Sequence, residues 1–390
     1  MSVPRTIAVV TVSRSDYGHL GPVLGALRDA PDVRLLLFVA GAHLVPEFGL
    51  TVREIEADGW PIAECVDMLE PDDSPEAVAG ATGRGVQGFA RAYAKHRPDL
   101  VVLLGDRFEM LAAAVAALPF ALPVAHIHGG EVTEGAMDNQ IRHAISKLAH
   151  LHFASAPIHA ERLARMDEEP WRIHMVGAPG LDRLRGRPLL SREELARRLD
   201  LPARGPWILV TFHPVTLEHQ DTTRHVEELV AALEAAPGTL VVTYPNADPA
   251  GRTIIAALEA FARRSTQVRL QPTLGEDVYL ALLEHADVMV GNSSSGLIEA
   301  PSFGLPTVNI GSRQRGRLRG DNVIDVGYGR DEIARGLGAA LASGLRSRLR
   351  ARPNPYGDGA AAPRIVEVLR GVPLDARLVQ KRAVVLKDPP

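Results

Sequence analysis

The first half of the chain alternates short apolar runs with longer segments in which apolar residues recur at helical spacing. The apolar runs predict strands over residues 7–12, 35–40, 100–104 and 123–127. The helical patterns lie over residues 20–28, 51–58, 86–95 and 108–118. Because these strands are apolar on both faces and are separated by helices, they indicate a parallel sheet that is covered on both sides.

The same alternation restarts after a glycine- and proline-containing segment at residues 177–188. Here the predicted strands are 207–212, 240–244, 268–270, 288–290, 307–310 and 323–326. The predicted helices are 192–199, 222–235, 251–263, 279–285 and 296–302. The fold class is therefore α/β, with two doubly wound, Rossmann-like domains facing a central cleft. We expect the domains at 1–180 and 181–363, followed by a helix and tail over 364–390 that could pack back on the first domain.

Composition narrows the class of protein. The 390 residues include 46% hydrophobic and 23% charged residues, which is ordinary for a globular protein. A formal net charge of −4 argues against a nucleic-acid-binding or membrane-binding surface. The N-terminus lacks the features of a signal peptide, and no apolar run is long enough for a membrane helix, so we expect a cytoplasmic location. The single cysteine, Cys65, fits a reducing compartment, and we expect it to be a small core residue.

Two loops of the first half carry candidate chemistry. The loop 13–18 follows the first strand and offers Arg14, Asp16 and backbone amides for a phosphate group. It is neither a GxGxxG nor a P-loop sequence, which disfavours NAD(P) and Walker-type ATP binding; its alternative is a capped turn with a surface arginine. Asp106 and Arg107 end the strand 100–104, where ligands collect. The alternative there is that Asp106 caps a helix and Arg107 is exposed.

The densest polar segment is 125–143. His126 and His128 are two residues apart and would share a strand face, and the following Gly129–Gly130 pair would let the backbone approach a ligand closely. Glu131 follows, and Asp138 and Arg142 share one face if this part is helical. Two histidines with carboxylates could bind zinc, but the spacing matches no HExxH pattern, and we expect no metal. Acid–base chemistry is favoured over a solvated charge cluster because the segment follows a buried strand.

In the second half, His213 ends a strand, and the loop 291–296 joins a strand to a helix. Its Asn292, Ser293, Ser294, Ser295 and Gly296 offer hydroxyls and amides that suit a diphosphate, and Glu299 could bind ribose hydroxyls. Arg313, after the next strand, is a further phosphate candidate. A structural histidine and a serine-rich helix cap are the alternatives. No serine lies in a GxSxG elbow, so an α/β-hydrolase is not expected.

These motifs together resemble the hydrolysing UDP-N-acetylglucosamine 2-epimerases of sialic-acid biosynthesis. The resemblance covers residues 5–360 in collinear order and rests on segments 13–20, 41–49, 104–111, 125–153, 290–314 and 354–359. It implies a GT-B-like fold, with the sugar and catalysis on the first domain and UDP on the second. The substrate-binding residues that it implies are Arg14, Asp16, His43, Arg107, His126, Asn292, Ser293, Ser294, Ser295, Gly296, Glu299 and Arg313.

The resemblance also implies a mechanism: elimination of UDP to a 2-acetamidoglucal, followed by addition of water with the opposite configuration at C2. We expect Glu131 and Asp106 to be the acid–base pair, with Asp138 and His128 as alternatives. Arg142 would keep a carboxylate ionised, and His213 would help to stabilise the departing UDP. No cofactor is expected. His128 departs from the family pattern, because non-hydrolysing relatives have a carboxylate there, and Asn139 replaces a common acidic residue.

Other functions remain open at this point. The same chemistry could yield UDP-N-acetylmannosamine without hydrolysis, or could act on a 2,4-diacetamido-trideoxyhexose. A glycosyltransferase of the same architecture would need an acceptor, and a non-catalytic nucleotide-sugar sensor would lack the acidic residues near the sugar. The partner that we expect is a UDP-sugar, with no nucleic acid or membrane, and the family suggests a homodimer or homotetramer.

Overall fold

The computed structural model describes residues 4–70, 74–134, 137–186, 188–245, 251–272 and 274–383. The chain divides into two compact units. The first comprises Met1–Val132, Met137–Arg185 and Tyr356–Pro390, and the second comprises Thr133–Ala136 and Gly186–Pro355. The sequence-based boundaries at 180/181 and 363/364 therefore differ by a few residues from the limits of these units. Part of the predicted tail, 384–390, lies outside the described residues.

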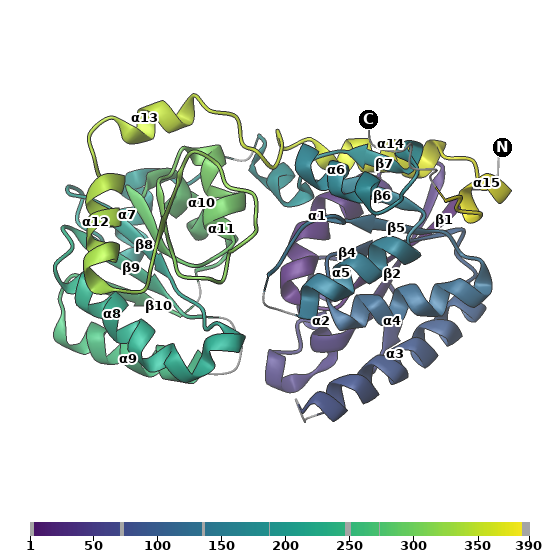
Figure 1. The fold of residues 1–390 in the computed structure, drawn as a ribbon, viewed down its shortest axis with the longest axis horizontal. Helices are drawn as coiled ribbons and strands as arrows, with labels where there is room; N and C mark the ends of the chain where they lie inside the picture. The colour runs from purple at the N-terminus through teal and green to yellow at the C-terminus, as the bar shows by residue number, and fades with distance from the viewer. Residues whose placement is uncertain are drawn as a thin grey trace, which may run out of the picture. The chain divides into compact units, whose positions relative to one another are not determined.

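A parallel sheet forms the centre of the first unit (Figure 1). In the described part of the chain its strands are β1 (Arg5–Thr11), β2 (Val33–Ala40), β3 (Ile62–Val66), β4 (Leu100–Leu104), β5 (Val124–Ile127), β6 (Leu151–Ala154) and β7 (Ile173–Met175). Their order is β3-β2-β1-β4-β5-β6-β7, so the direction of winding reverses between β1 and β4. Ligands bind at the carboxyl ends of strands near such a reversal.

Helices cover both faces of this sheet. They are α1 (Arg14–Arg28), α2 (Val52–Ala57), α3 (Pro75–His96), α4 (Phe108–Ala117), α5 (Met137–Leu148), α6 (Pro157–Arg165), α14 (Ala361–Gly371) and α15 (Ala376–Val379). Along β1, Ile7 and Val9 pack with α1 and α14, whereas Ala8 and Val10 pack with α3 and α4. This alternation is what a strand buried on both faces requires.

The second unit repeats the plan. Its strands are β8 (Trp207–Thr211), β9 (Thr239–Thr243), β10 (Val268–Gln271), β11 (Val288–Gly291), β12 (Thr307–Ile310) and β13 (Val323–Val326). Its helices are α7 (Arg192–Leu199), α8 (Thr222–Glu234), α9 (Gly251–Arg264), α10 (Glu276–His285), α11 (Ser295–Ile298), α12 (Arg330–Ala340) and α13 (Leu345–Arg350). All described strand pairs are parallel, in the order β10-β9-β8-β11-β12-β13, and the reversal falls between β8 and β11. The prediction of two doubly wound α/β sheets is confirmed.

Short 3₁₀ helices connect several of these elements, at Gly41–Leu44, Pro46–Phe48, Leu118–Phe120, Pro170–Arg172, Pro179–Leu184, Thr216–Asp221 and Ala300–Phe303. The predicted helix 296–302 is therefore two short helices, α11 and the 3₁₀ turn that follows it. The predicted loop 13–18 is mostly the first turn of α1, which begins at Arg14.

Cys65 is exposed, so its assignment to the core was wrong. It lies on β3, the edge strand of the first sheet, where the neighbouring Val66 is buried instead.

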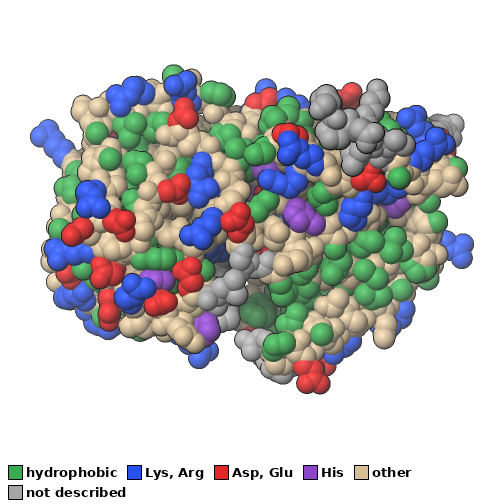
Figure 2. Space-filling model, viewed as in Figure 1, with side chains coloured by type: hydrophobic (Ala, Val, Ile, Leu, Met, Phe, Trp, Pro, Cys, Tyr) green, Lys and Arg blue, Asp and Glu red, His purple; other side chains and the backbone are tan. Residues whose placement is uncertain are grey.

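On the face shown in Figure 2, apolar side chains gather over α4. Val115, Leu118 and Phe120, in α4 and the turn after it, are 37%, 48% and 44% exposed. Among the described helices, none combines the length and apolar character needed to cross a bilayer.

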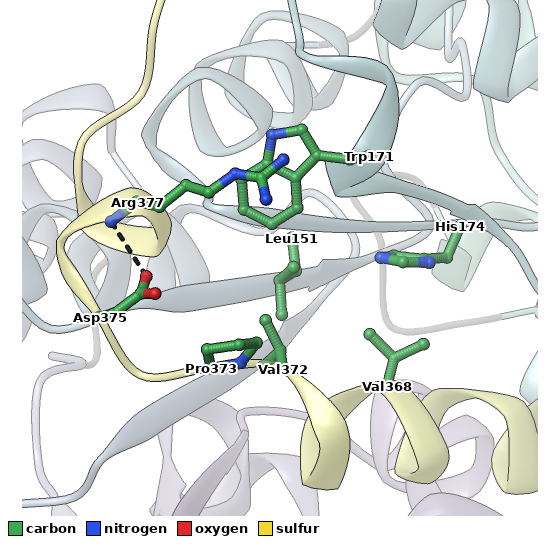
Figure 3. Close-up of a pocket in the computed structure, with 8 residues that line it drawn as sticks. All are labelled: Leu151, Trp171, His174, Val368, Val372, Pro373, Asp375 and Arg377. Carbon is green, nitrogen blue, oxygen red and sulfur yellow. Dashed lines mark hydrogen bonds between the residues drawn. The ribbon is translucent and has the colours of Figure 1, made fainter.

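A pocket of about 290 Å³ opens at the amino end of β6 in the first unit (Figure 3). It is lined by Leu151, Trp171, His174, Val368, Val372, Pro373, Asp375 and Arg377. The Arg377 guanidinium lies 4.6 Å from the centre of the Trp171 ring, and the Asp375 carboxylate caps α15. Because the pocket contains none of the predicted site residues and adjoins the start of a strand, it is separate from the site described below.

Candidate active site

Arg142 brings together several predicted catalytic residues at the carboxyl edge of the first sheet. Its guanidinium pairs with the Asp106 carboxylate beyond β4, donates a 3.0 Å hydrogen bond to the His128 carbonyl oxygen, and lies 3.7 Å from Glu131 Oε2. Arg142 is only 3% exposed, on the buried face of the amphipathic helix α5. A buried guanidinium requires such partners, so the charge of Arg142 and the two carboxylates stabilise one another.

Glu131 is enclosed by donors. Its Oε1 accepts a hydrogen bond of 2.5 Å from His128 Nδ1 and one of 2.6 Å from Ser155 Oγ, and the residue is 3% exposed. Burial would raise the pKa of Glu131. The neighbouring His128, through its hydrogen bond, and the positive charge of Arg142 outweigh burial and hold this pKa well below its ordinary value. Glu131 is therefore an ionised, buried acceptor.

Ser155 and His159 complete this cluster and were not predicted. Ser155 follows β6, and its Oγ lies 2.8 Å from His159 Nδ1 on α6. Burial lowers the pKa of His159 to about 4, so its ring is neutral near pH 7. The available signal was the position of Ser155 at the carboxyl end of a strand, but β6 itself was not recognised in the sequence.

His126 and His128 do not share a strand face as predicted. β5 ends at Ile127, and His128 has a φ of 65°, in the left-handed region. The fully buried His126 ring instead lies 2.7 Å from the Gly105 carbonyl oxygen through Nε2 and 3.1 Å from Ser146 Oγ through Nδ1. Both ring nitrogens of His126 thus bind the protein, and the ring holds Gly105, the residue before Asp106. A contact of His126 with substrate stays a prediction.

The Gly129–Gly130 pair is required by packing inside the first unit, and its close approach to a ligand stays a prediction. A Cβ on Gly130, which has a φ of 75°, would lie 2.4 Å from the carbonyl oxygen of His159. A Cβ on Gly129 would lie 3.0 Å from His126 Nδ1. The glycines therefore let this loop lie against α6 and beside His126.

Arg107, rather than Asp106, is the cap residue of α4, so the alternative that Asp106 caps this helix was wrong. The Arg107 guanidinium makes hydrogen bonds of 2.8 and 3.1 Å to the buried Glu109 carboxylate. Burial would lower the pKa of Arg107, but Glu109, Asp16 and Asp138 together raise it. Asp138 is half-buried in the first turn of α5, one turn before Arg142, as the predicted shared helix face requires.

Asp16 and His43 belong to an internal network beneath the start of α1. The Asp16 carboxylate accepts hydrogen bonds from Thr11 Oγ1 (2.7 Å), the Val12 amide (3.0 Å) and the Ser13 hydroxyl. His43 lies 3.0 Å from Thr11 Oγ1 and 2.7 Å from Thr51 Oγ1, and burial lowers its pKa to about 4.

Both Asp16 and His43 are buried, so the structure shows them supporting this loop. Arg14 is exposed and lies 3.4 Å from Glu54 Oε2. A role of these three residues in substrate binding stays a prediction.

A second network lies at the carboxyl edge of the other sheet, between β8 and β11. The Asn292 side chain accepts from the His213 amide (2.7 Å) and donates to the His213 carbonyl oxygen (2.8 Å). The Asn292 carbonyl oxygen accepts from Arg313 Nη1 (3.2 Å) and from Gln314 Nε2 (2.7 Å). Burial and the charge of Arg313 lower the pKa of His213 to about 3. Asn292 therefore joins three predicted binding segments of the second unit.

The serine loop continues from this network. Ser294 precedes α11, the Ser295 amide lies 3.4 Å from Ser293 Oγ, and Ser295 and Glu299 are buried. Gly296 is held close to β12, because a Cβ there would lie 2.5 Å from Thr307 Cγ2. Within the described ranges, no group of three or more His, Cys, Asp or Glu side chains is arranged to hold a metal ion.

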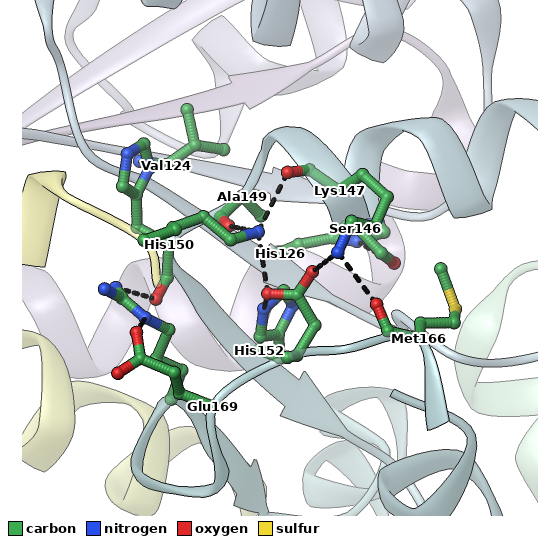
Figure 4. A network of polar contacts seen from close by, with 12 residues as sticks. Val124, His126, Ser146, Lys147, Ala149, His150, His152, Met166 and Glu169 are labelled. Carbon is green, nitrogen blue, oxygen red and sulfur yellow. Dashed lines mark hydrogen bonds and ion pairs between the residues drawn. The ribbon is translucent and has the colours of Figure 1, made fainter. Parts of the chain in front are cut away.

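A buried ion-pair network lies beside β6 in the first unit (Figure 4). Glu168 is 1% exposed and pairs with Lys147 (2.8 Å), Lys381 (2.6 Å) and His152 (3.0 Å). Burial would raise the pKa of Glu168, but these three partners lower it to about 2. His152 is the register partner of His126 on β5, so Lys381 is connected through Glu168 and His152 to the strand that precedes His128.

Comparison with known proteins gives a family. The family model for UDP-N-acetylglucosamine 2-epimerase matches residues 25–370. The chain is 37% identical to a UDP-N,N'-diacetylbacillosamine 2-epimerase (hydrolyzing) from Legionella pneumophila, over 97% of this chain and 98% of the relative. It is 36% identical to a GDP/UDP-N,N'-diacetylbacillosamine 2-epimerase (hydrolyzing) from Campylobacter jejuni, over 82% of this chain and 84% of the relative.

Among solved structures, the fold is similar to that of a UDP-GlcNAc 2-epimerase from Neisseria meningitidis bound to UDP-GlcNAc. The TM-score is 0.78 at 17% identity, and the match covers 94% of this chain and 99% of that chain. At this identity the match concerns the fold, and it agrees with the expected GT-B-like class.

Proposed function

Because the chain belongs to the UDP-N-acetylglucosamine 2-epimerase family, we propose that it is a hydrolysing UDP-sugar 2-epimerase, which inverts C2 of a 2-acetamido sugar and releases that sugar from UDP. The observation that carries this proposal is the cluster of Asp106, His128, Glu131 and Arg142 at the carboxyl edge of the first sheet. Carboxylates, an imidazole and a guanidinium in one buried cluster can accept and return the proton that the reaction moves at C2.

The C2–H bond of such a sugar is not acidic, so inversion needs a good leaving group at C1. In the first step a base takes the C2 proton, the C–H electrons form the C1=C2 bond, and the C1–O electrons leave with the diphosphate. In the second step water gives hydroxide to C1, while C2 receives a proton on the opposite face. Cations near the diphosphate lower the barrier of the first step.

We place UDP at the carboxyl edge of the second sheet, at the reversal between β8 and β11. The supports are the Arg313 guanidinium and the hydroxyls of Ser293 and Ser294 in the loop that Asn292 holds. A cation beside hydroxyl donors favours the binding of an anion such as a diphosphate. Glu299 is assigned to the ribose, as the resemblance implies, and the neutral His213 is assigned to the leaving diphosphate.

We propose UDP-N,N'-diacetylbacillosamine, a 4-acetamido sugar nucleotide, as the preferred substrate, and UDP-N-acetylglucosamine as the second candidate. The support is that both hydrolysing relatives at 36–37% identity carry the first name. Asn139 also supports a different sugar. It lies on α5, the helix that carries Arg142, and replaces an acidic residue that is common in the family, so we assign it to a different sugar substituent.

The test is incubation of the protein with each UDP-sugar in D₂O, with coupled detection of free UDP and NMR of the sugar. We expect stoichiometric UDP, a free sugar inverted at C2 and carrying deuterium there, and a larger kcat/KM for the diacetamido sugar. A product that keeps UDP would indicate a non-hydrolysing epimerase, and turnover only with an added acceptor would indicate a glycosyltransferase. No UDP from either compound would refute the proposal.

We also propose a homo-oligomer, as the family suggests. The exposed Val115, Leu118 and Phe120 side chains are the support, because contiguous apolar surface on a protein of this size favours self-association. Light scattering after size exclusion should give a mass of at least twice 42.0 kDa, and a monomer at micromolar concentration would contradict this.

A further inference from the structure

The two ring nitrogens of His128 have different surroundings. Nδ1 lies 2.5 Å from Glu131 Oε1, whereas Nε2 has no hydrogen-bond partner among the residues that the structure describes. An ionised carboxylate only accepts hydrogen bonds, so Nδ1 carries the proton of the neutral ring. The lone pair of His128 is therefore on Nε2, the nitrogen that faces away from Glu131.

Glu131 has no free position for a substrate proton. Ser155 donates its only hydroxyl proton to Glu131, and so accepts a hydrogen bond from His159 Nδ1. The donors on Oε1 are thus His128 and Ser155, and the Arg142 guanidinium lies 3.7 Å from Oε2. For Glu131 to take the C2 proton, it would have to give up these contacts inside a site where it is 3% exposed.

The backbone of His128 is fixed as firmly as its ring. Its φ of 65° is unusual for a residue with a side chain, and such strain persists only where the surroundings enforce it. Here the His128 amide donates to the Phe153 carbonyl oxygen (3.1 Å), and the His128 carbonyl oxygen accepts from Arg142 Nη1 (3.0 Å). Strain of this kind concentrates at positions where one side chain must point in one direction.

We infer that His128, through Nε2, is the catalytic base that removes the C2 proton, and that Glu131 is a positioning residue held by Ser155 and His159. This inference rests on the proposed epimerase activity and reverses the expected roles of the two residues. The Nε2 lone pair takes the proton as the C1–O bond breaks, and the ring becomes an imidazolium. The buried Glu131 carboxylate stabilises that cation, as a carboxylate does for a catalytic histidine in other enzymes.

The charged and titratable groups that face His128 come from four elements. They are Glu131 on its own loop, Arg142 on α5, His159 on α6 and His19 on α1, whose ring centre lies 6.2 Å from that of His128. Glu131 is the anion among them in direct contact, so it interacts with the ring more strongly than the others do.

The experiment compares wild type, His128→Gly, Glu131→Gln and His96→Gln on the UDP-sugar that the wild type turns over. Glycine accepts the positive φ and leaves space for a free imidazole. The matched control is His96, a histidine outside the cluster whose Nε2 lies 2.7 Å from Glu64 Oε2. We expect His128→Gly to lower kcat about 10²–10⁴-fold, and added imidazole to restore at least about 10-fold of that loss.

Glu131→Gln is expected to lower kcat less than His128→Gly, with no response to imidazole. It should also move the acid limb of kcat/KM to lower pH, because the imidazolium loses its carboxylate partner. A purely structural role of Glu131 would leave that limb in place. His96→Gln should match wild type in kcat, in the response to imidazole and in the pH profile of kcat/KM.

Wild-type kcat in His128→Gly would overturn the inference. The inference would also be overturned if Glu131→Gln lowered kcat as much as His128→Gly does and imidazole did not restore the kcat of His128→Gly. If His128→Gly does not fold, as judged by circular dichroism, His128→Asn replaces it, because asparagine tolerates positive φ. Failure of the epimerase proposal is separate, because it shows as absence of UDP release by the wild type itself.

Discussion

At the scale of single residues, Asp106 and Glu131 share the Arg142 guanidinium but differ in access. The Asp106 side chain is 22% exposed and the Glu131 side chain 4%. Asp106 is therefore the more accessible of the two carboxylates, and we propose it as the second acid–base group, which returns a proton or activates water.

Asp106→Asn tests this role. We expect kcat to fall about 10²–10⁴-fold, because the amide can neither donate nor accept a proton at neutral pH. The unfolding temperature should also fall, because the buried Arg142 guanidinium loses a charged partner, so circular dichroism at the assay temperature must show that the variant is folded. Asp32→Asn is the control: Asp32 also pairs with an arginine, Arg370 at 2.7 Å, but precedes β2 at the opposite edge of the sheet. Equal activity of the two variants would exclude Asp106 from the chemistry.

Sequence patterns named the residues of the cluster, whereas their roles stay predictions. Asp106 was predicted because it follows the strand 100–104, where ligands collect, and Glu131 and Arg142 because they belong to a dense polar segment after a buried strand. Asp16 and His43 have the same residue types, yet both are buried among hydroxyls and amides of their own loop. Residue type and position after a strand do not distinguish these cases, because the partners lie on other segments.

At the scale of elements, strands that form apolar runs were predictable even when short, whereas elements whose apolar pattern is interrupted by histidines or glycines were not. β6 and β7 have four and three residues and contain His152 and His174, so they lack an apolar run. α3 begins at Pro75, eleven residues before its predicted start at 86. Its first turns contain glycines that weaken the helical pattern. A Cβ on Gly85 would lie 2.9 Å from Ala112 Cβ on α4, so this glycine is required by helix packing that the sequence does not display.

Gly291, the last residue of β11, decides whether the serine loop can form. Its φ is 135°, and a Cβ there would lie 1.9 Å from the carbonyl oxygen of Thr211 on β8. We expect Gly291→Ala to lower the free energy of unfolding by at least about 3 kcal/mol, because the two strands would have to separate. The measurement is thermal unfolding followed by circular dichroism.

Gly275→Ala is the matched control in the same unit. Gly275 also has a positive φ, 69°, but no atom lies within 4 Å of the position of a Cβ. Only backbone strain is added there, so we expect a smaller loss, on the order of 1–3 kcal/mol. Equal losses in the two variants would show that the close approach of β8 and β11 is not what restricts residue 291.

At the scale of the whole molecule, the return of the C-terminal segment to the first unit depends on buried polar contacts. Arg172, fully buried, donates to the carbonyl oxygens of Leu378 and Arg377 at 2.8 Å each, and Lys381 reaches Glu168. Ile365 and Leu369 of α14 join the core beside α1. The sequence shows that α14 is amphipathic, but its apolar face packs on α1, and Arg172 and Glu168, which bind the segment after α14, lie about 200 residues earlier in the chain.

The molecule also contains a set of histidines that are buried as neutral rings. Burial lowers the pKa of His126 and His213 to about 3, and that of His43, His150 and His159 to about 4. In the unfolded chain each ring takes up a proton near pH 6.5. The stability that these rings provide is thus complete above pH 6.5 and is lost as the pH falls from 6.5 towards 4.

Each such ring contributes a slope of about 1.4 kcal/mol per pH unit within that window. Glu168, whose pKa is lowered to about 2, adds a loss only below about pH 4.5, where unfolded glutamates become protonated. Thermal unfolding at pH 7.5, 6.5 and 5.0 therefore isolates the histidines. We expect little change between 7.5 and 6.5, and a fall of at least about 5 °C between 6.5 and 5.0. An unfolding temperature that stays constant down to pH 5.0 would mean that these rings are protonated in the folded protein, and that the uncharged state assigned to His159 beside Ser155 is wrong.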